Sequence, residues 1–162
     1  MAVISDEMIK MLNYRIQQEE ASSRLYLAMS LWLDVNGYTG AAKVWKEYSE
    51  EEKTHADWSY KYLTDLNIIP TVPALETPKS DFKGLPEIIV ESYRHELEIT
   101  KQVTEFAKAA NAAGDYMTFG IAQKFVDEQI NELAKTNTLV DKLKAFGTDK
   151  IALRLLDNEL AG

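Results

Sequence analysis

The positions of proline and glycine constrain the fold of this chain most strongly. All four prolines lie between residues 70 and 86, and most glycines stand at breaks in a helical pattern. Between these breaks apolar residues recur at steps of three and four, without a convincing alternating strand pattern. The pattern predicts four long helices and a short fifth one, at about 6–35, 40–66, 85–111, 115–146 and 148–160. Ser5 and Thr148 are the expected N-caps, and Pro86 suits the first turn of its helix.

The lengths of the connections predict the topology. A few residues join the first two helices, and a few join the third to the fourth, so each pair is antiparallel. Residues 67–84 separate the two pairs. This segment can extend for roughly 60 Å, whereas the second helix is about 40 Å long at 1.5 Å per residue. We therefore predict an all-α fold, namely a four-helix bundle with one long crossover connection plus a short fifth C-terminal helix, in a single domain over residues 1–162.

Each long helix carries a seven-residue repeat of inward positions that a glutamate interrupts near its middle. The four glutamates are Glu19, Glu52, Glu96 and Glu132, and His55 follows Glu52 on the same stripe. Glu19 and Glu52 are equidistant from the first turn, and Glu96 and Glu132 are equidistant from the last turn between long helices. All four carboxylates and His55 are therefore predicted to meet in one layer at mid-bundle.

Four ionised glutamates cannot share a dry core, because desolvation and mutual repulsion both raise their pKa values. Two divalent cations would balance the four negative charges, and His55 would add one nitrogen donor. Oxygen-rich ligation with one imidazole suits ferrous iron or manganese, and zinc could also occupy such a site. The alternative, in which these residues are water-linked carboxylates and a satisfied histidine, stays open.

Composition excludes several other functions. The chain has 162 residues and no cysteine, which excludes disulfides, cysteine-bound zinc, iron–sulfur clusters and thiol catalysis. A net charge of −8 argues against nucleic acid and anionic membranes as partners and is compatible with attracting cations. No apolar stretch approaches the length of a membrane span. The start lacks the pattern of a secretory signal, and we expect a cytoplasmic protein.

Three segments resemble the prokaryotic non-haem ferritins: SEEEKTHADW at 49–58, YRHELEIT at 93–100 and FVDEQINEL at 125–133. The resemblance covers nearly the whole chain, including the long crossover and the last helix. The fourth helix carries Gln129 and Glu132 where many di-iron bundles carry Glu-x-x-His. That difference matches ferritins and speaks against bacterioferritins and di-iron oxygenases. No methionine stands near the site in the second helix as a haem ligand would, so no haem is expected.

The resemblance implies a dinuclear non-haem iron centre. Glu19, Glu52 and His55 would hold the first iron, Glu52 would bridge, and Glu96 and Glu132 would complete the second. Gln129 would orient dioxygen or a bound oxygen species. Tyr26 would hydrogen-bond a ligand carboxylate and supply an electron, although it could equally be a core tyrosine with a satisfied hydroxyl.

Bacterial ferritins also have a third iron site, which Glu51 and Glu128 match here. Asn131 stands where the pattern expects another acid, so this site loses one negative charge and its occupancy is open. Glu51 and Glu128 could equally be solvated or inner-surface charges. His95 flanks Glu96 on another face, and we interpret it as structural.

A second apolar patch on the first helix, made of Leu25, Ala28, Met29 and Trp32, suggests a subunit interface. In ferritins the last helix, here with Ile151, Leu155 and Leu156, packs around a symmetry axis of a 24-subunit shell. The resemblance thus implies a homo-oligomeric iron store with ferroxidase activity, in which dioxygen or hydrogen peroxide oxidises Fe(II). The alternatives are a di-iron peroxidase or oxygenase without a storage role, and a regulatory helical bundle without metal.

Overall fold

The structure, a computed structural model, describes residues 3–162, which form five α-helices and no strand. The helices are α1 (Asp6–Val35), α2 (Thr39–Asp65), α3 (Leu85–Ala112), α4 (Tyr116–Phe146) and α5 (Lys150–Leu160). The predicted fold class is confirmed, and each predicted helix end lies within two residues of the observed one.

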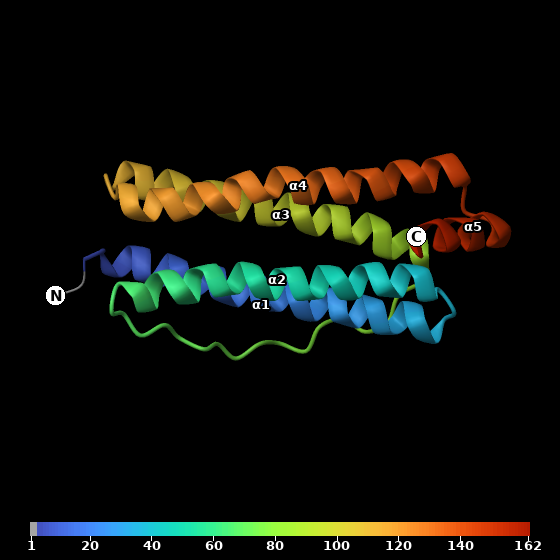
Figure 1. Cartoon of the computed structure of the whole chain (residues 1–162), viewed down its shortest axis with the longest axis horizontal. Helices are drawn as coiled ribbons and strands as arrows, with labels where there is room; N and C mark the ends of the chain where they lie inside the picture. The colour runs from blue at the N-terminus through green and yellow to red at the C-terminus, as the bar shows by residue number, and fades with distance from the viewer. Residues whose placement is uncertain (1–2) are drawn as a thin grey trace.

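Two antiparallel hairpins, α1 with α2 and α3 with α4, lie side by side to form an elongated bundle (Figure 1). The segment between α2 and α3 has no helix and runs along the α1–α2 hairpin for most of the length of the bundle, so that α2 and α3 run parallel (Figure 1). Buried Phe82 anchors this crossover at one end, and Asn13 accepts a hydrogen bond from the backbone of Thr71 (2.9 Å).

Capping residues explain where several helices begin. Ser5 accepts a hydrogen bond from the backbone of Met8 (3.2 Å), which confirms it as the N-cap of α1. Pro86 lies in the first turn of α3, as predicted. The prediction of Thr148 as a cap is wrong. Asp149 caps α5 instead, because its carboxylate accepts from the backbone of both Ile151 and Ala152 (3.0 Å each) and its charge suits a helix N-terminus.

The apolar core is divided into two clusters, one toward each end of the bundle. One cluster includes Met29, Leu33, Trp45 and Leu156, and the other includes Met8, Leu63 and Phe125. Between them lies a layer of buried polar side chains that come from all four long helices: Glu19, Glu52, His55, Glu96, Gln129 and Glu132. Polar side chains thus replace apolar ones in the middle of the core. Their burial is unfavourable unless hydrogen bonds or bound ions compensate it.

The predicted interface patch on α1 is wrong for one of its members. Met29 is fully buried in the core of its own chain, whereas Leu25, Ala28 and Trp32 are only partly buried. In the second half of α1 the exposed large apolar residues are Leu27, Leu31 and Val35, with 37%, 58% and 86% of their surfaces accessible. The face that a partner could cover is therefore rotated from the predicted one.

Helix α5 docks at one end of the bundle (Figure 1) through a close approach of two backbones. A Cβ atom on Gly40 would lie 2.2 Å from the carbonyl oxygen of Asp157, so no larger residue fits without a shift. The Asp157 carboxylate accepts a hydrogen bond from the backbone of Ala41 (2.8 Å). Leu156 is buried by this docking, whereas Ile151 and Leu155 remain exposed.

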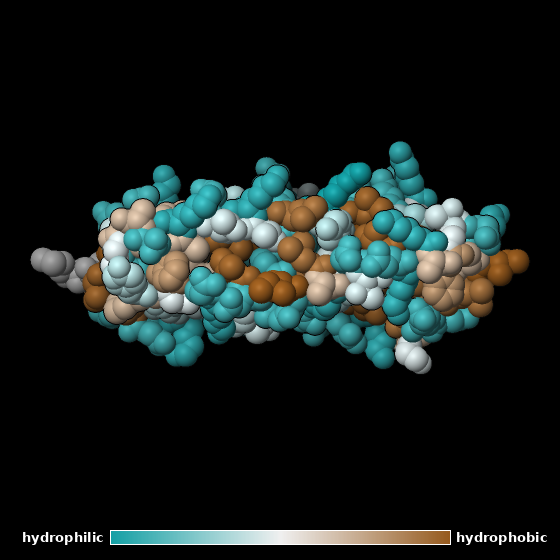
Figure 2. All heavy atoms as spheres, turned by 90° about the horizontal axis from the view of Figure 1, so that it is seen from above, coloured by the Kyte–Doolittle hydropathy of each residue, from teal (hydrophilic) through white to brown (hydrophobic). Residues whose placement is uncertain are grey.

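The outer face of the α3–α4 hairpin mixes polar and apolar side chains along its length (Figure 2). Leu97 of α3 and Ile130 of α4 are exposed apolar residues of this hairpin. Within residues 3–162, every helix is too short or too polar to cross a lipid bilayer.

Candidate metal centre

The five predicted ligands converge at the middle of the bundle. Three overlapping groups each offer three ligand atoms that lie within 4.8 Å of one another. The groups are Glu19, Glu52 and His55; Glu52, Glu96 and Glu132; and His55, Glu128 and Glu132. The heptad stripes explain the convergence, because each stripe turns its central glutamate toward the same level of the core.

The first group lies within the α1–α2 hairpin. His55 Nδ1 lies 3.0 Å from Glu52 Oε2 and 3.9 Å from Glu19 Oε2. The other ring nitrogen, Nε2, lies 3.8 Å from Glu128 Oε1. Because one nitrogen faces both buried carboxylates, Nδ1 is the candidate donor to a cation held between Glu19 and Glu52.

In the second group both oxygens of Glu96 have a donor. The Tyr26 hydroxyl donates to Glu96 Oε1, and Gln129 Nε2 donates to Glu96 Oε2 (3.1 Å) and to Thr100 Oγ1 (3.1 Å). Tyr26 is therefore both a buried core tyrosine and a partner of a candidate ligand. The amide of Gln129 is directed at Glu96, which makes it a positioning group for that carboxylate.

The electrostatics of the layer disfavour an empty, fully ionised site. Burial, followed by repulsion from Glu19, raises the pKa of Glu52 well above its usual value. Burial raises the pKa of Glu132 to about 8, although the charge of Lys135 opposes this rise. Burial and then the charge of Glu96 raise the pKa of Tyr26 well above its usual value. Without a metal ion, Glu52 and Glu132 therefore keep protons at pH values at which they would be charged in water.

A divalent cation fits the residues present. Glu132 Oε1 is buried and lacks a well-aligned hydrogen bond, even though Lys135 Nζ lies 3.1 Å away. An unpaired buried carboxylate oxygen is costly unless a cation or a donor satisfies it. The donor set of four carboxylates and one imidazole suits Fe(II) or Mn(II) and would also accept Zn(II).

Sequence reasoning missed two cations that flank the layer. Arg15 is 1% exposed; its Nε donates to Glu19 Oε1 (3.1 Å) and its Nη2 to Gln102 Oε1 (3.1 Å). Lys135 lies 2.5 Å from Glu51 Oε2 and 3.1 Å from Glu132 Oε1. Their spacing from the glutamates, four residues before Glu19 and three after Glu132, is the signal that could have found them.

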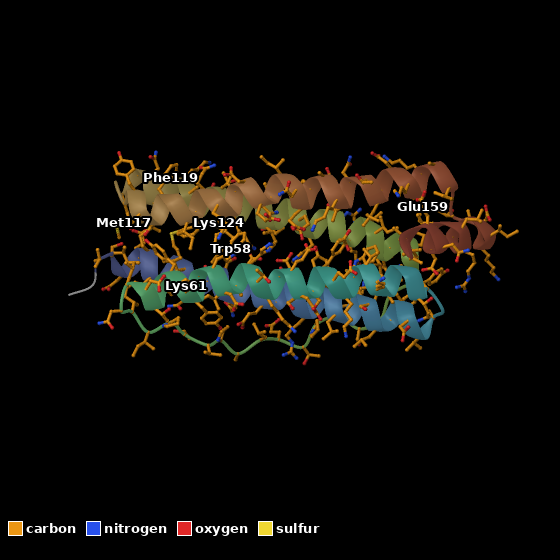
Figure 3. The ribbon with its side chains drawn as sticks, in the orientation of Figure 1. Trp58, Lys61, Met117, Phe119, Lys124 and Glu159 are labelled. Atoms are coloured by element: carbon orange, nitrogen blue, oxygen red, sulfur yellow. The ribbon has the colours of Figure 1, made fainter. Side chains whose placement is uncertain are left out.

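The two acids predicted for a third iron site have different partners. Glu51 is exposed and paired with Lys135, whereas Glu128 is half-buried and approaches His55. Asn131 and Glu128 border a hollow beside Trp58. At this hollow Trp58 and Lys124 point toward one another between α2 and α4 (Figure 3), and Lys124 Nζ lies 4.0 Å from the centre of a Trp58 ring. A third site with Glu51 therefore stays a prediction.

His95 takes part in a network behind Glu96. Its Nε2 lies 2.7 Å from Ser22 Oγ, and its ring packs edge-on against Tyr26 with ring centres 5.7 Å apart. Burial lowers the pKa of His95, which favours the neutral ring. This environment agrees with the structural role expected for it.

Comparison with known proteins gives one consistent result. Residues 9–146 match the family described as Ferritin-like domain. The chain is 35% identical over 159 residues to a bacterial non-heme ferritin of Escherichia coli O6:H1, with 98% of this chain and 96% of that protein covered. It is 32% identical over 155 residues to a bacterial non-heme ferritin of Campylobacter jejuni, with 96% of this chain and 93% of that protein covered. Among solved structures, an open pore ferritin from Archaeoglobus fulgidus superposes with a TM-score of 0.94 at 32% identity, covering 99% of this chain and 98% of that chain.

Proposed function

The chain belongs to the ferritin family, and from this premise we propose that it stores iron by oxidising Fe(II) at the central carboxylate–histidine layer. Fe(II) is the substrate, and the ferric product is kept as mineral inside a homo-oligomer. One observation carries the proposal: Glu52 belongs to two groups of three ligand atoms, so a single carboxylate can hold two cations side by side.

Each cation would have its own ligands besides the shared Glu52. The first Fe(II) binds Glu19 and Nδ1 of His55, which lie in the same hairpin as Glu52. The second Fe(II) binds Glu96 and Glu132, which come from α3 and α4. Two +2 ions balance the four carboxylates, which offsets the burial and the mutual repulsion that raise the pKa values of Glu52 and Glu132 in the metal-free chain.

Pairing two Fe(II) ions matches the electron count of the oxidant. Each Fe(II) gives up one electron on becoming Fe(III). Two electrons and two protons convert one dioxygen into hydrogen peroxide, and two electrons and two protons convert one hydrogen peroxide into two waters. A site that holds both ions together therefore completes either reduction without releasing a one-electron product.

The surrounding residues contribute position and charge. Tyr26 and Gln129 each hold one oxygen of Glu96, and Arg15 holds one oxygen of Glu19. These carboxylates are thus oriented before a cation arrives, which reduces the cost of ordering them on binding. Tyr26 is also the phenol nearest to Glu96 and is the candidate source of an additional electron.

Storage requires a cavity, which one chain of this shape does not enclose. We propose a cytoplasmic homo-oligomer of 24 subunits, as the family resemblance implies. The exposed apolar residues Leu27, Leu31 and Val35 on α1, and Ile151 and Leu155 on α5, are the candidate contacts between subunits.

An anaerobic Fe(II) titration followed by a pulse of dioxygen tests the proposal. We expect about two Fe(II) per chain, and oxidation in pairs when dioxygen is added. Glu52→Gln should bind less iron and oxidise it far more slowly, because it weakens both positions. The matched control Glu159→Gln changes an exposed glutamate of α5 (Figure 3) and should behave like the native protein. No Fe(II) binding to the native protein, or elution as a stable monomer in size-exclusion chromatography, would contradict the proposal.

A further inference from the structure

The two cations beside the metal layer differ in how freely they can move. Arg15 is 1% exposed and donates to both Glu19 and Gln102, so that leaving Glu19 would bury an unpaired charge. The side chain of Lys135 is 33% exposed, and its ammonium lies between Glu132 inside the layer and Glu51 on the exposed side. Only Lys135 has a second carboxylate toward solvent to which it can retreat.

The contacts of Lys135 hold it more firmly to Glu51 than to Glu132. Nζ is 2.5 Å from Glu51 Oε2 and 3.1 Å from Glu132 Oε1, and it lies 4.9 Å from the centre of the Tyr48 ring. The contact to Glu132 is not aligned as a hydrogen bond, because Glu132 Oε1 lacks an aligned partner. The ammonium therefore contributes charge to Glu132 without a directed bond that would be lost on departure.

A divalent cation at the second position would conflict with Lys135. That position uses Glu132, so the cation and the ammonium would compete for the same carboxylate oxygen and repel one another at close range. The first position does not include Glu132 and leaves Lys135 undisturbed.

We propose that Lys135 is a displaceable counter-ion of the second metal position: in the metal-free chain its ammonium faces the ionised form of Glu132, and it leaves Glu132 for solvent, keeping Glu51, when a divalent cation binds Glu52, Glu96 and Glu132. The inference rests on the proposed function, since it assumes that these three carboxylates bind iron. Because Lys135 can return to Glu132 when the cation leaves, the second position would be the one that fills and empties reversibly. Reversible binding suits iron that passes through the site as a substrate.

The test measures the chemical reactivity of individual lysines in the native protein at pH 8.5, where Glu132 of the metal-free chain is mostly ionised. Trace acetic anhydride acetylates lysines, and peptide mass spectrometry gives the rate at each one. The probe is Zn(II), which is redox-inert and should fill the histidine-containing first position before the second. Lys142 is the internal control, because its side chain is 36% exposed and pairs with Glu159 at 2.9 Å away from the layer.

We expect one Zn(II) per chain to leave both rates unchanged. The second Zn(II) should raise the rate at Lys135 by about tenfold, because the cation repels the ammonium from Glu132 and leaves it more accessible to the reagent. Lys142 should not respond. Binding of two Zn(II) without any change at Lys135 would overturn the inference and leave the proposed function standing. No Zn(II) or Fe(II) binding at all would contradict both.

A pair of variants shows whether Glu132 is the group that holds Lys135. In metal-free Glu132→Gln, Lys135 should react faster than in the native protein and show no further response to a second equivalent of Zn(II). In Glu159→Gln, Lys142 should react faster and Lys135 should keep its full response. Circular dichroism of each variant checks that the helices remain. A native response to the second equivalent in Glu132→Gln would show that Lys135 moves for another reason, and would overturn the inference.

Discussion

The raised pKa of Glu132 predicts that the metal-free protein becomes less stable as the pH rises from 5 to 8. Burial holds the pKa of this carboxyl at about 8 in the folded chain, against about 4.5 when it is unfolded. The folded chain thus binds the proton more tightly than the unfolded chain. The stability gained from that proton is fully present below the unfolded value and is lost as the pH rises through about 8.

The magnitude follows from the pKa difference. Between pH 5 and 8 the folded chain keeps nearly one proton on Glu132 that the unfolded chain lacks, at about 1.4 kcal/mol per pH unit. The expected loss in the free energy of unfolding is roughly 3–4 kcal/mol from this residue. The pKa of Glu52 is raised as well, so its contribution has the same sign.

Urea unfolding of EDTA-treated protein, followed by circular dichroism at pH 5, 6, 7 and 8 and at one protein concentration, measures this loss. Net charge also changes over this range, so the native slope alone is not decisive. Glu132→Gln keeps a neutral side chain of similar shape and should remove about 3 kcal/mol of the pH dependence. Glu159→Gln, at an exposed glutamate, should keep the native slope. Identical slopes in the native protein and Glu132→Gln would refute the reasoning.

Three other predictions concern separate parts of the molecule. His55→Ala should slow stopped-flow Fe(II) oxidation at least about tenfold while helicity is kept, since paired oxidation needs both ions in place; a native rate would mean that the histidine is not a ligand. Gly40→Ala should destabilise the chain by about 1–3 kcal/mol, because its Cβ would meet the Asp157 carbonyl 2.2 Å away. Gly120→Ala, in the second turn of α4 with open space around the new Cβ, should instead stabilise the chain by up to about 1 kcal/mol in urea unfolding; equal effects would contradict the close approach. Leu31→Glu should yield smaller species in size-exclusion chromatography with helicity kept, and unchanged elution would remove this face of α1 from the interface.

The heptad argument located the layer of buried carboxylates because it depends only on helix periodicity and on the length of the turns. The inward positions that the repeat predicts on α1 are all buried, namely Leu12, Ile16, Glu19, Ser23, Tyr26, Ser30 and Leu33. On α2 the stripe is less exact, and Tyr48 and Tyr62 are only partly buried. Tyrosine has a long side chain, so a position that points inward does not bury the whole residue.

Other features depend on information that periodicity does not contain. Buried arginines are rare, so Arg15 reads as a surface residue until Glu19 and Gln102 are seen around it. Met29 lies next to the stripe of α1, and only the width of the core decides whether it is covered. The choice between Thr148 and Asp149 as the cap of α5 depends on a shift of one residue in the backbone, which sequence patterns do not resolve.

The long crossover means that the two halves of the bundle are covalently joined by a segment without helical structure. The first metal position lies wholly in the α1–α2 hairpin, whereas the second takes Glu52 from one hairpin and Glu96 and Glu132 from the other. A cation at the first position would therefore link α1 to α2 within one hairpin. A cation at the second position would link the α1–α2 hairpin to the α3–α4 hairpin. A cation that binds only the docked arrangement stabilises it by mass action. Of the two cations, only the second would oppose separation of the hairpins, and it would add to the apolar clusters and to the Tyr26–Glu96 and Arg15–Gln102 hydrogen bonds that already join them.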